Sequence, residues 1–162
     1  MQLVPLFKLL LLLTLANGTP IAAKRIFGAR FALAFDGGAK FPDGRPWLGP
    51  SKTIRGVLAS IIVTTLAAPL LGLDFAIGAV VAVTAMAGDL FSSFVKRRMN
   101  FPSSSQAIGL DQIPEALFPM LACRNALSLT AGDITLGLLI FFVGELLLSR
   151  LLFWLRFRDR PY

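Results

Sequence analysis

The chain contains no histidine and only one cysteine, Cys123, among its 162 residues. A lone cysteine cannot form a disulfide within the chain, and without histidine it cannot complete a zinc cluster. The absence of histidine also removes the usual general base of enzymes that work near neutral pH. Any catalysis by this chain therefore depends on carboxylates, hydroxyl groups, lysine and arginine.

Charged residues are scarce as well, at 15% of the chain. Soluble domains carry about 25% charged residues. Hydrophobic residues make up 56% of the chain, and its mean hydropathy is +0.73. These values and the short length indicate a single integral membrane domain over residues 1–162.

Five apolar stretches approach the roughly 20 residues that a helix needs to cross a bilayer. We therefore predict an all-α fold, a polytopic transmembrane bundle of about five spans with a structured cytoplasmic loop between the first two. Glu115, Arg124 and Asn125 interrupt the fourth stretch, which makes it the weakest of the five. The expected spans are residues 2–16, 56–73, 75–94, 114–130 and 134–155.

The connections between these stretches differ in charge. The short connections at 72–74 and 131–133 each carry an acid and no cation. By the positive-inside rule the basic segments lie in the cytoplasm and the N-terminus lies outside. The first stretch lacks a positive start and has Lys8 within it, so we expect a retained span rather than a cleaved signal peptide. The basic segments outside the spans carry Lys24, Arg25, Arg30, Lys40, Arg45, Lys52, Arg55, Lys96, Arg97, Arg98, Arg156, Arg158 and Arg160.

The third span ends in residues that are costly to bury. Asp89 lies near the end of the apolar run, where an ionised carboxylate needs a partner or a function. Ser92, Ser93 and Lys96 follow at helical spacing, so they share a face with Asp89. An acid, two hydroxyls and cations at a membrane surface indicate a site for Mg²⁺ and a polyphosphate. The simpler alternative is a salt bridge from Asp89 to Lys96 or Arg97.

A second acidic segment, Asp111-Gln112-Ile113-Pro114-Glu115, comes just before the fourth span. Proline is tolerated in the first turn of a helix, so Asp111 is expected immediately before that turn. By the topology above, Asp89 and Asp111 share one membrane face. Asp111 is therefore a candidate second carboxylate of a metal pair, or else an acid that suits the helix dipole.

The loop before the second span is rich in glycine and proline over residues 35–50, and Lys52, Thr53 and Arg55 follow it. Glycines let backbone N–H groups approach an anion, and a basic helix N-terminus is a natural seat for phosphate. The alternative is a turn-rich loop whose cations set the topology or touch anionic lipid. The spacing does not match a Walker A loop.

A different class of function remains open at this stage. Arg124 and Glu145 lie within apolar stretches, as a structural pair or as the lining of a path in a small transporter or membrane interaction protein. The inverted repeats that secondary transporters often show are not evident. The basic residues alternate with spans and form no single patch, which argues against binding of nucleic acid.

The three polar segments, in this order, resemble the CDP-archaeol synthase family. That family is related to the CDP-diglyceride synthases, membrane enzymes that transfer a cytidylyl group from CTP. The resemblance covers roughly residues 17–117 and departs from the family pattern at Pro114, where a second acid is common, while Glu115 follows one residue later. It rests on Asp36-Gly37-Gly38, on residues 43–56, on Gly88-Asp89 with residues 93–98, and on Asp111-Gln112.

The resemblance implies transfer of a cytidylyl group from CTP to a lipid phosphate, either an archaeal ether lipid or phosphatidate, with release of pyrophosphate. It implies dependence on Mg²⁺, an active site that faces the cytoplasm, and contact with membrane lipids. It assigns catalysis to Asp89, Lys96 and Asp111, and metal binding to Asp89, Asp111 and Glu115. It assigns substrate binding to Asp36, Lys52, Thr53, Arg55, Ser92, Ser93, Arg97 and Gln112.

Overall fold

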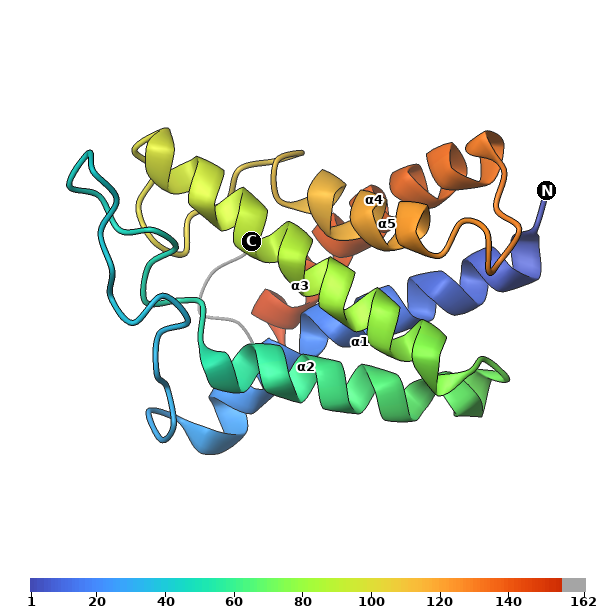
Figure 1. Ribbon diagram of the computed structural model, residues 1–162, viewed down its shortest axis with the longest axis horizontal. Coiled ribbons are helices and arrows are strands. Elements are labelled where there is room, and N and C mark those ends of the chain that lie inside the picture. Colours follow the sequence, from blue (N-terminus) through green and yellow to red (C-terminus); the bar gives the residue numbers. More distant parts are fainter. Residues whose placement is uncertain (156–162) are drawn as a thin grey trace.

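The computed structural model describes residues 1–155, and over this range the chain is helical with no β-strands (Figure 1). The predicted all-α fold is confirmed. The predicted basic residues Arg156, Arg158 and Arg160 lie outside the described residues. The helices are α1 (Leu3–Phe27), α2 (Ile54–Ala67) with its 3₁₀ continuation η1 (Ala68–Leu71), α3 (Phe75–Arg98), α4 (Gln112–Ala122) and α5 (Ala131–Trp154).

Four segments within the described residues are long and apolar enough to cross a membrane: α1, α2 with η1, α3, and α5 over Ala131–Leu151. The fourth predicted stretch, 114–130, is wrong as a continuous helix, because α4 has only 11 residues. At a rise of about 1.5 Å per residue this is about 16 Å. A hydrocarbon core is about 30 Å thick, so α4 by itself reaches roughly half of that thickness.

The chain turns immediately after α4. The Leu127 N–H donates to the Cys123 carbonyl at 2.9 Å, the Leu129 N–H donates to the Arg124 carbonyl at 2.8 Å, and Ser128 has a left-handed φ of 52°. Arg124 is exposed on this turn. The turn leads directly into the start of α5, whereas Glu145 lies roughly 20 Å beyond that start, in the second half of the helix. The predicted Arg124–Glu145 pair therefore does not form.

Helix α1 continues 11 residues beyond the predicted end at residue 16, through Pro20. Proline has no N–H, so Pro20 cannot bond to the Ala16 carbonyl four residues earlier. The Ser60 hydroxyl of α2 donates to that carbonyl instead, at 2.8 Å. A contact from a neighbouring helix thus replaces the missing bond and lets α1 continue.

Small residues bring the helices together. Gly56, Ser60 and Thr64 recur every fourth residue on α2 and are all buried. At Gly78 of α3 an added Cβ would lie 2.7 Å from the Ala68 Cβ. Such small-residue faces are typical of helix packing in membranes, where close approach replaces the hydrophobic effect. The core that results includes Leu6, Leu9, Leu13, Ala16, Val81, Ala85 and Met120.

The two ends of the bundle differ in the segments that they carry. The loop 28–53 and the segment 99–111 lie at one end, and the N-terminus, the 72–74 connection and the 123–130 turn lie at the other (Figure 1). The two basic segments within the described residues therefore share one end. Which end faces the cytoplasm stays a prediction.

Helices α3 and α4 approach each other closely at Gly88. A Cβ added there would lie 2.5 Å from the Pro114 carbonyl carbon and 2.7 Å from the Glu115 nitrogen. The backbone of α3 thus rests directly on the first turn of α4. This contact places Asp89, the next residue of α3, beside Glu115.

We expect Gly88→Ala to lower the melting temperature in detergent, because the new methyl group overlaps backbone atoms that cannot rotate away. Overpacking of this kind costs about 1–3 kcal/mol. Gly132→Ala on α5 is the matched control, since a Cβ there meets only the Thr130 hydroxyl at 3.7 Å. Equal melting temperatures for the two variants would contradict the close approach at Gly88.

Candidate active site

A partly buried ion pair joins the long loop to α3. Lys52 extends its ammonium group to Asp89, and its Nζ bonds to the Asp89 Oδ1. The two side chains are only 23% and 19% exposed. The Asp89 carboxyl also lies within hydrogen-bonding reach of the Glu115 carboxyl on α4. We call Asp89, Asp111 and Glu115 the acidic cluster, since the charge of each acts on Lys52.

The acidic cluster keeps Lys52 charged. Burial alone would lower the pKa of the Lys52 ammonium, but the nearby carboxylates, Asp89 first and then Glu115 and Asp111, raise that pKa above its ordinary value. A permanent cation therefore lies among the three acids. It offsets the repulsion that would otherwise separate α3 from the start of α4.

Asp111 has a different direct partner. Lys96 approaches the Asp111 carboxylate at 2.7 Å, and its Nζ also donates to the Ser105 carbonyl at 2.9 Å. Arg97 is buried and donates to the Pro102 carbonyl at 2.9 Å. These contacts fasten the segment 99–111 to the end of α3. The predicted phosphate-binding cations Lys96 and Arg97 thus lie at the same end of the bundle as Lys52.

Three other predicted residues surround the acidic cluster. The Ser92 hydroxyl donates to the Asp89 carbonyl at 2.9 Å, and Ser93 beside it is buried. Gln112 is buried, and its Oε1 accepts a bond from the Gly109 N–H at 2.8 Å. Their substrate contacts stay predictions.

The loop 28–53 is organised by Asp36. Its carboxylate accepts bonds from the N–H groups of Gly38, Leu48 and Gly49, at 3.0, 2.9 and 3.0 Å. Burial alone would raise the pKa of this carboxyl, but the bonds from Gly49, Leu48 and Gly38 hold the pKa below the ordinary value of 3.8. The Phe35 N–H donates to the Lys52 carbonyl at 2.7 Å, so the folded loop fixes the backbone of Lys52.

Thr53 and Arg55 have structural partners. The Thr53 hydroxyl accepts a bond from the Gly56 N–H at 3.1 Å and caps α2. Arg55 donates to the carbonyls of Gly28 and Arg30, and its guanidinium lies 5.8 Å from the centre of the Phe27 ring. These contacts hold the exit of α1 against the start of α2. A role for either residue in substrate binding stays a prediction.

Arg98 was assigned only a topological role from the sequence, yet it clamps the loop to α3. Its Nη1 bonds to the Asp43 carboxylate at 2.5 Å. Its guanidinium lies 4.6 Å from the centre of the Phe41 ring and 5.1 Å from that of Phe94. Trp47 completes the aromatic group, 5.7 Å from Phe41. The spacing of Phe94 and Arg98, four apart on one helix face, is the only local signal of this clamp.

Binding of Mg²⁺ at the acidic cluster stays a prediction. Within residues 1–155 no three acidic or cysteine side chains form a complete metal cage. Mg²⁺ usually uses one or two protein carboxylates and takes its other ligands from water and phosphate. Asp89 and Glu115 have carboxyl groups within hydrogen-bonding reach of each other, whereas Asp111 pairs with Lys96 and Asp89 also pairs with Lys52.

A family model described as CarS-like, CDP-archaeol synthase, matches residues 2–162. The chain belongs to the CDP-archaeol synthase family. The CDP-archaeol synthase of Pyrococcus furiosus is 38% identical over 107 residues, so the match spans 60% of this chain and 60% of that relative. That of Thermococcus gammatolerans is 33% identical over 137 residues, 78% of this chain and 76% of the relative.

A solved structure supports the same assignment. It is described as an intramembrane enzyme for archaeal membrane lipids biosynthesis. It shares 29% sequence identity and a TM-score of 0.70 with this chain, and the match covers 85% of this chain and 90% of the other. The predicted CDP-archaeol synthase family and helical membrane fold are confirmed.

We expect Asp36→Asn to loosen the loop at neutral pH, because an amide nitrogen cannot accept the bonds that the carboxylate takes from backbone N–H groups. Fluorescence of Trp47, measured with Trp154 replaced by phenylalanine, reports this loosening. The folded pKa of Asp36 is lowered, so its stabilising effect is complete above pH 3.8 and is lost as the pH falls through the folded value.

The pH dependence supplies the control for this prediction. Lowering the pH should change the fluorescence of Trp47 in the protein that retains Asp36, because protonation of Asp36 loosens the loop. Asp36→Asn should show a smaller change in fluorescence over the same pH range. Identical acid transitions in the two proteins would contradict the role of Asp36 in the loop.

Proposed function

We propose that this chain transfers a cytidylyl group from CTP to a lipid phosphate and so forms a CDP-activated lipid and pyrophosphate. The observation that carries the proposal is the Lys52 ammonium held among Asp89, Glu115 and Asp111 at the end of the bundle where the basic segments meet. The names of the relatives support the same activity. An archaeal ether lipid is the acceptor class that those names favour.

The reaction suits a chain without histidine. A lipid phosphate is already ionised at neutral pH, so its oxygen can attack the α-phosphorus of CTP without a general base. A new P–O bond forms, the bond from the α-phosphorus to the bridging oxygen breaks, and pyrophosphate leaves with the electron pair. Such a reaction needs alignment of the two substrates and neutralisation of their charge.

The cations of the site have distinct parts in this proposal. Lys52 neutralises Asp89 in the resting protein and can exchange that carboxylate for a phosphate oxygen. Lys96 and Arg97 are buried beside Asp111, where they offset further negative charge. When bound by Asp89 and Glu115, Mg²⁺ would supply the remaining positive charge for the phosphates. Asp36 and Arg98 act indirectly, because they fold the loop that delivers Lys52.

The proposal places the site at the cytoplasmic face and the N-terminus outside. The two basic segments in residues 1–155 lie at the end that carries Lys52 and Asp89, as the positive-inside rule requires for this orientation. CTP is a cytoplasmic nucleotide, so this orientation gives it access. The lipid acceptor arrives from the bilayer at the same level.

We expect Asp89→Asn to reduce incorporation of labelled CTP into lipid by about 100-fold or more, the usual scale for losing a charge-stabilising group. The assay extracts membranes incubated with labelled CTP, Mg²⁺ and an ether-linked or ester-linked lipid phosphate. Asp74→Asn, an exposed acid at the other end of the bundle, is the matched control. A fully active Asp89→Asn protein of normal melting temperature would remove the central claim.

Lys52→Met tests whether the ammonium and a divalent ion share the same carboxylates. Without the ammonium the acidic cluster carries uncompensated charge, so Mn²⁺ used in place of Mg²⁺ should bind about tenfold more tightly in the absence of CTP. Electron paramagnetic resonance of free Mn²⁺ measures this affinity, and CTP turnover should fall in parallel. Lys40→Met, an exposed loop position, should leave both unchanged. Unchanged Mn²⁺ affinity in Lys52→Met would show that the metal does not bind the carboxylates that Lys52 neutralises.

A further inference from the structure

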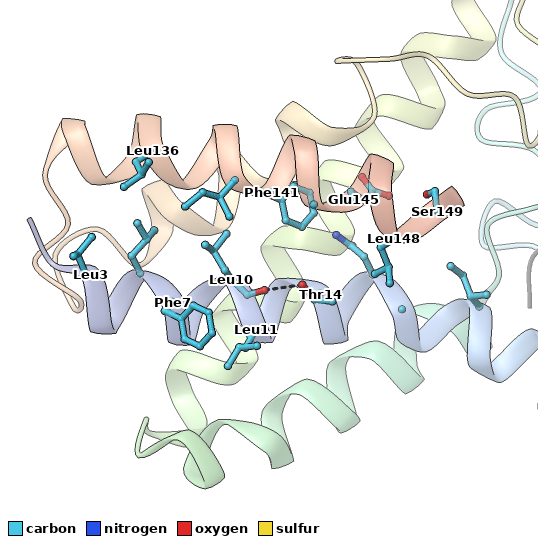
Figure 2. A pocket seen from close by; sticks show the side chains of 16 residues that line it. Leu3, Phe7, Leu10, Leu11, Thr14, Leu136, Phe141, Glu145, Leu148 and Ser149 are labelled. Atoms are coloured by element: carbon cyan, nitrogen blue, oxygen red, sulfur yellow. Dashed lines mark hydrogen bonds between the residues drawn. The ribbon is translucent and has the colours of Figure 1, made fainter. Parts of the chain in front are cut away.

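A hollow of about 640 Å³ lies between α1 and α5 (Figure 2), and its lining includes no residue of the acidic cluster. Its walls are mainly leucine and phenylalanine side chains. Small-molecule sites commonly enclose about 300–1,000 Å³, so the hollow has the size of a binding site. We call it the α1–α5 groove.

The α1–α5 groove is long as well as apolar. Its lining runs from Leu3 to Ile21 on α1 and from Leu136 to Ser149 on α5. On α1 this is roughly 27 Å at the helical rise. The groove therefore follows most of the roughly 30 Å of a hydrocarbon core, parallel to the chains of the lipids around it. Its shape suits one extended hydrocarbon chain.

Two glycines help to keep the groove open. A Cβ added at Gly18 of α1 or at Gly144 of α5 would meet nothing within 4 Å. At Gly88 and Gly137, by contrast, an added Cβ would overlap atoms of a neighbouring helix. Gly18 and Gly144 therefore do not serve close helix packing, and because both line the groove, a larger side chain at either position can extend into it.

One end of the groove is polar and adjoins the acidic cluster. Figure 2 shows Glu145 and Ser149 at this end, with Leu3 and Leu136 at the opposite end. The charge of Glu145 acts on Glu115, so this end lies next to the acidic cluster.

Asn17 also lines the groove, and its Nδ2 is buried without a hydrogen-bond partner. An unsatisfied buried donor is costly, so a ligand oxygen there would stabilise the complex. The groove thus offers a long apolar channel for a hydrocarbon chain and a donor for an oxygen near the head of the same molecule.

We propose that the α1–α5 groove binds one hydrocarbon chain of the lipid phosphate, with a glycerol oxygen at Asn17 and the phosphate directed toward Lys52 in the acidic cluster. This proposal rests on the proposed function and adds to it the route by which the lipid reaches the site. The chain lies along α1 and α5 within the bilayer. CTP enters from the aqueous end, beside the loop 28–53.

Gly144→Leu and Gly18→Leu test the groove, because each fills it without touching the acidic cluster. Both changes replace a glycine within a helix by a better helix former, so folding should be preserved. Val143→Leu is the matched control, since Val143 is exposed on α5 and does not line the groove. The acceptors are a lipid phosphate with long chains and one with short chains that do not need the groove.

With the long-chain acceptor, both groove variants should raise the KM for lipid about tenfold or more, because each buried methylene that is displaced weakens binding several-fold. The KM for CTP and turnover of the short-chain acceptor should stay near those of the unsubstituted protein. Val143→Leu should behave like the unsubstituted protein with both acceptors. Unchanged lipid KM in both groove variants would overturn the proposal while the enzymatic function stands.

Direct binding separates failure of the groove from failure of the function. Native mass spectrometry of the protein with the same two lipid phosphates reports binding without turnover. If no CDP-lipid forms at all, selective loss of long-chain binding in Gly144→Leu still supports the groove, and equal binding overturns it. If Gly144→Leu instead changes the oligomeric state and leaves lipid binding intact, the groove is an interface between copies of the chain and the proposal is wrong.

Discussion

The position of one ammonium group determines much of this structure. The carboxyl groups of Asp89 and Glu115 lie within hydrogen-bonding reach at the edge of a helical bundle, where water is scarce and negative charge needs a nearby partner. Lys52 lies among them and makes their proximity tolerable. Because Lys52 comes from a loop and the acids come from α3 and α4, these three parts of the chain must be placed together. The folding of the loop is thus coupled to the packing of the helices.

One contact between helices and two sets of loop contacts achieve this placement. At Gly88 the absence of a side chain lets α3 rest on the backbone of α4, which sets the spacing of the two acids. On the other side, Asp36 ties the loop to itself, and Arg98 holds the loop against α3 through a carboxylate and two aromatic rings. The contact at Gly88 fixes Asp89, and the contacts of the loop fix Lys52, its partner in the ion pair. A change at Gly88 or Arg98 therefore reaches the site without touching a substrate.

The sequence predicted the helical membrane fold, because apolar run length carries that information, and it predicted the family through the resemblance of its polar segments. The roles of the predicted site residues stay predictions. It did not predict that Asp89 pairs with Lys52, 37 residues away, or that Glu115 is a nearer carboxyl neighbour of Asp89 than Asp111 is. Those pairings depend on how helices cross. The continuation of α1 past Pro20 was missed for a similar reason, since the bond from Ser60 belongs to another helix. The short α4 was missed because an apolar composition over 114–130 does not reveal the turn at Cys123–Leu129.

Glycine illustrates why composition alone could not distinguish the close contact between α3 and α4 from the α1–α5 groove. Gly88 and Gly144 both lie in helices, yet one allows helices to touch and the other leaves a hollow. For the proposed transfer to a lipid phosphate these are complementary requirements. The charged site needs helices packed closely enough to exclude water and hold like charges together, whereas a lipid needs a gap through which its chains stay in the bilayer while its head reaches the charge. A bundle that uses glycine for both purposes can expose one site to both water and the bilayer, as the proposed reaction between CTP and a membrane lipid requires.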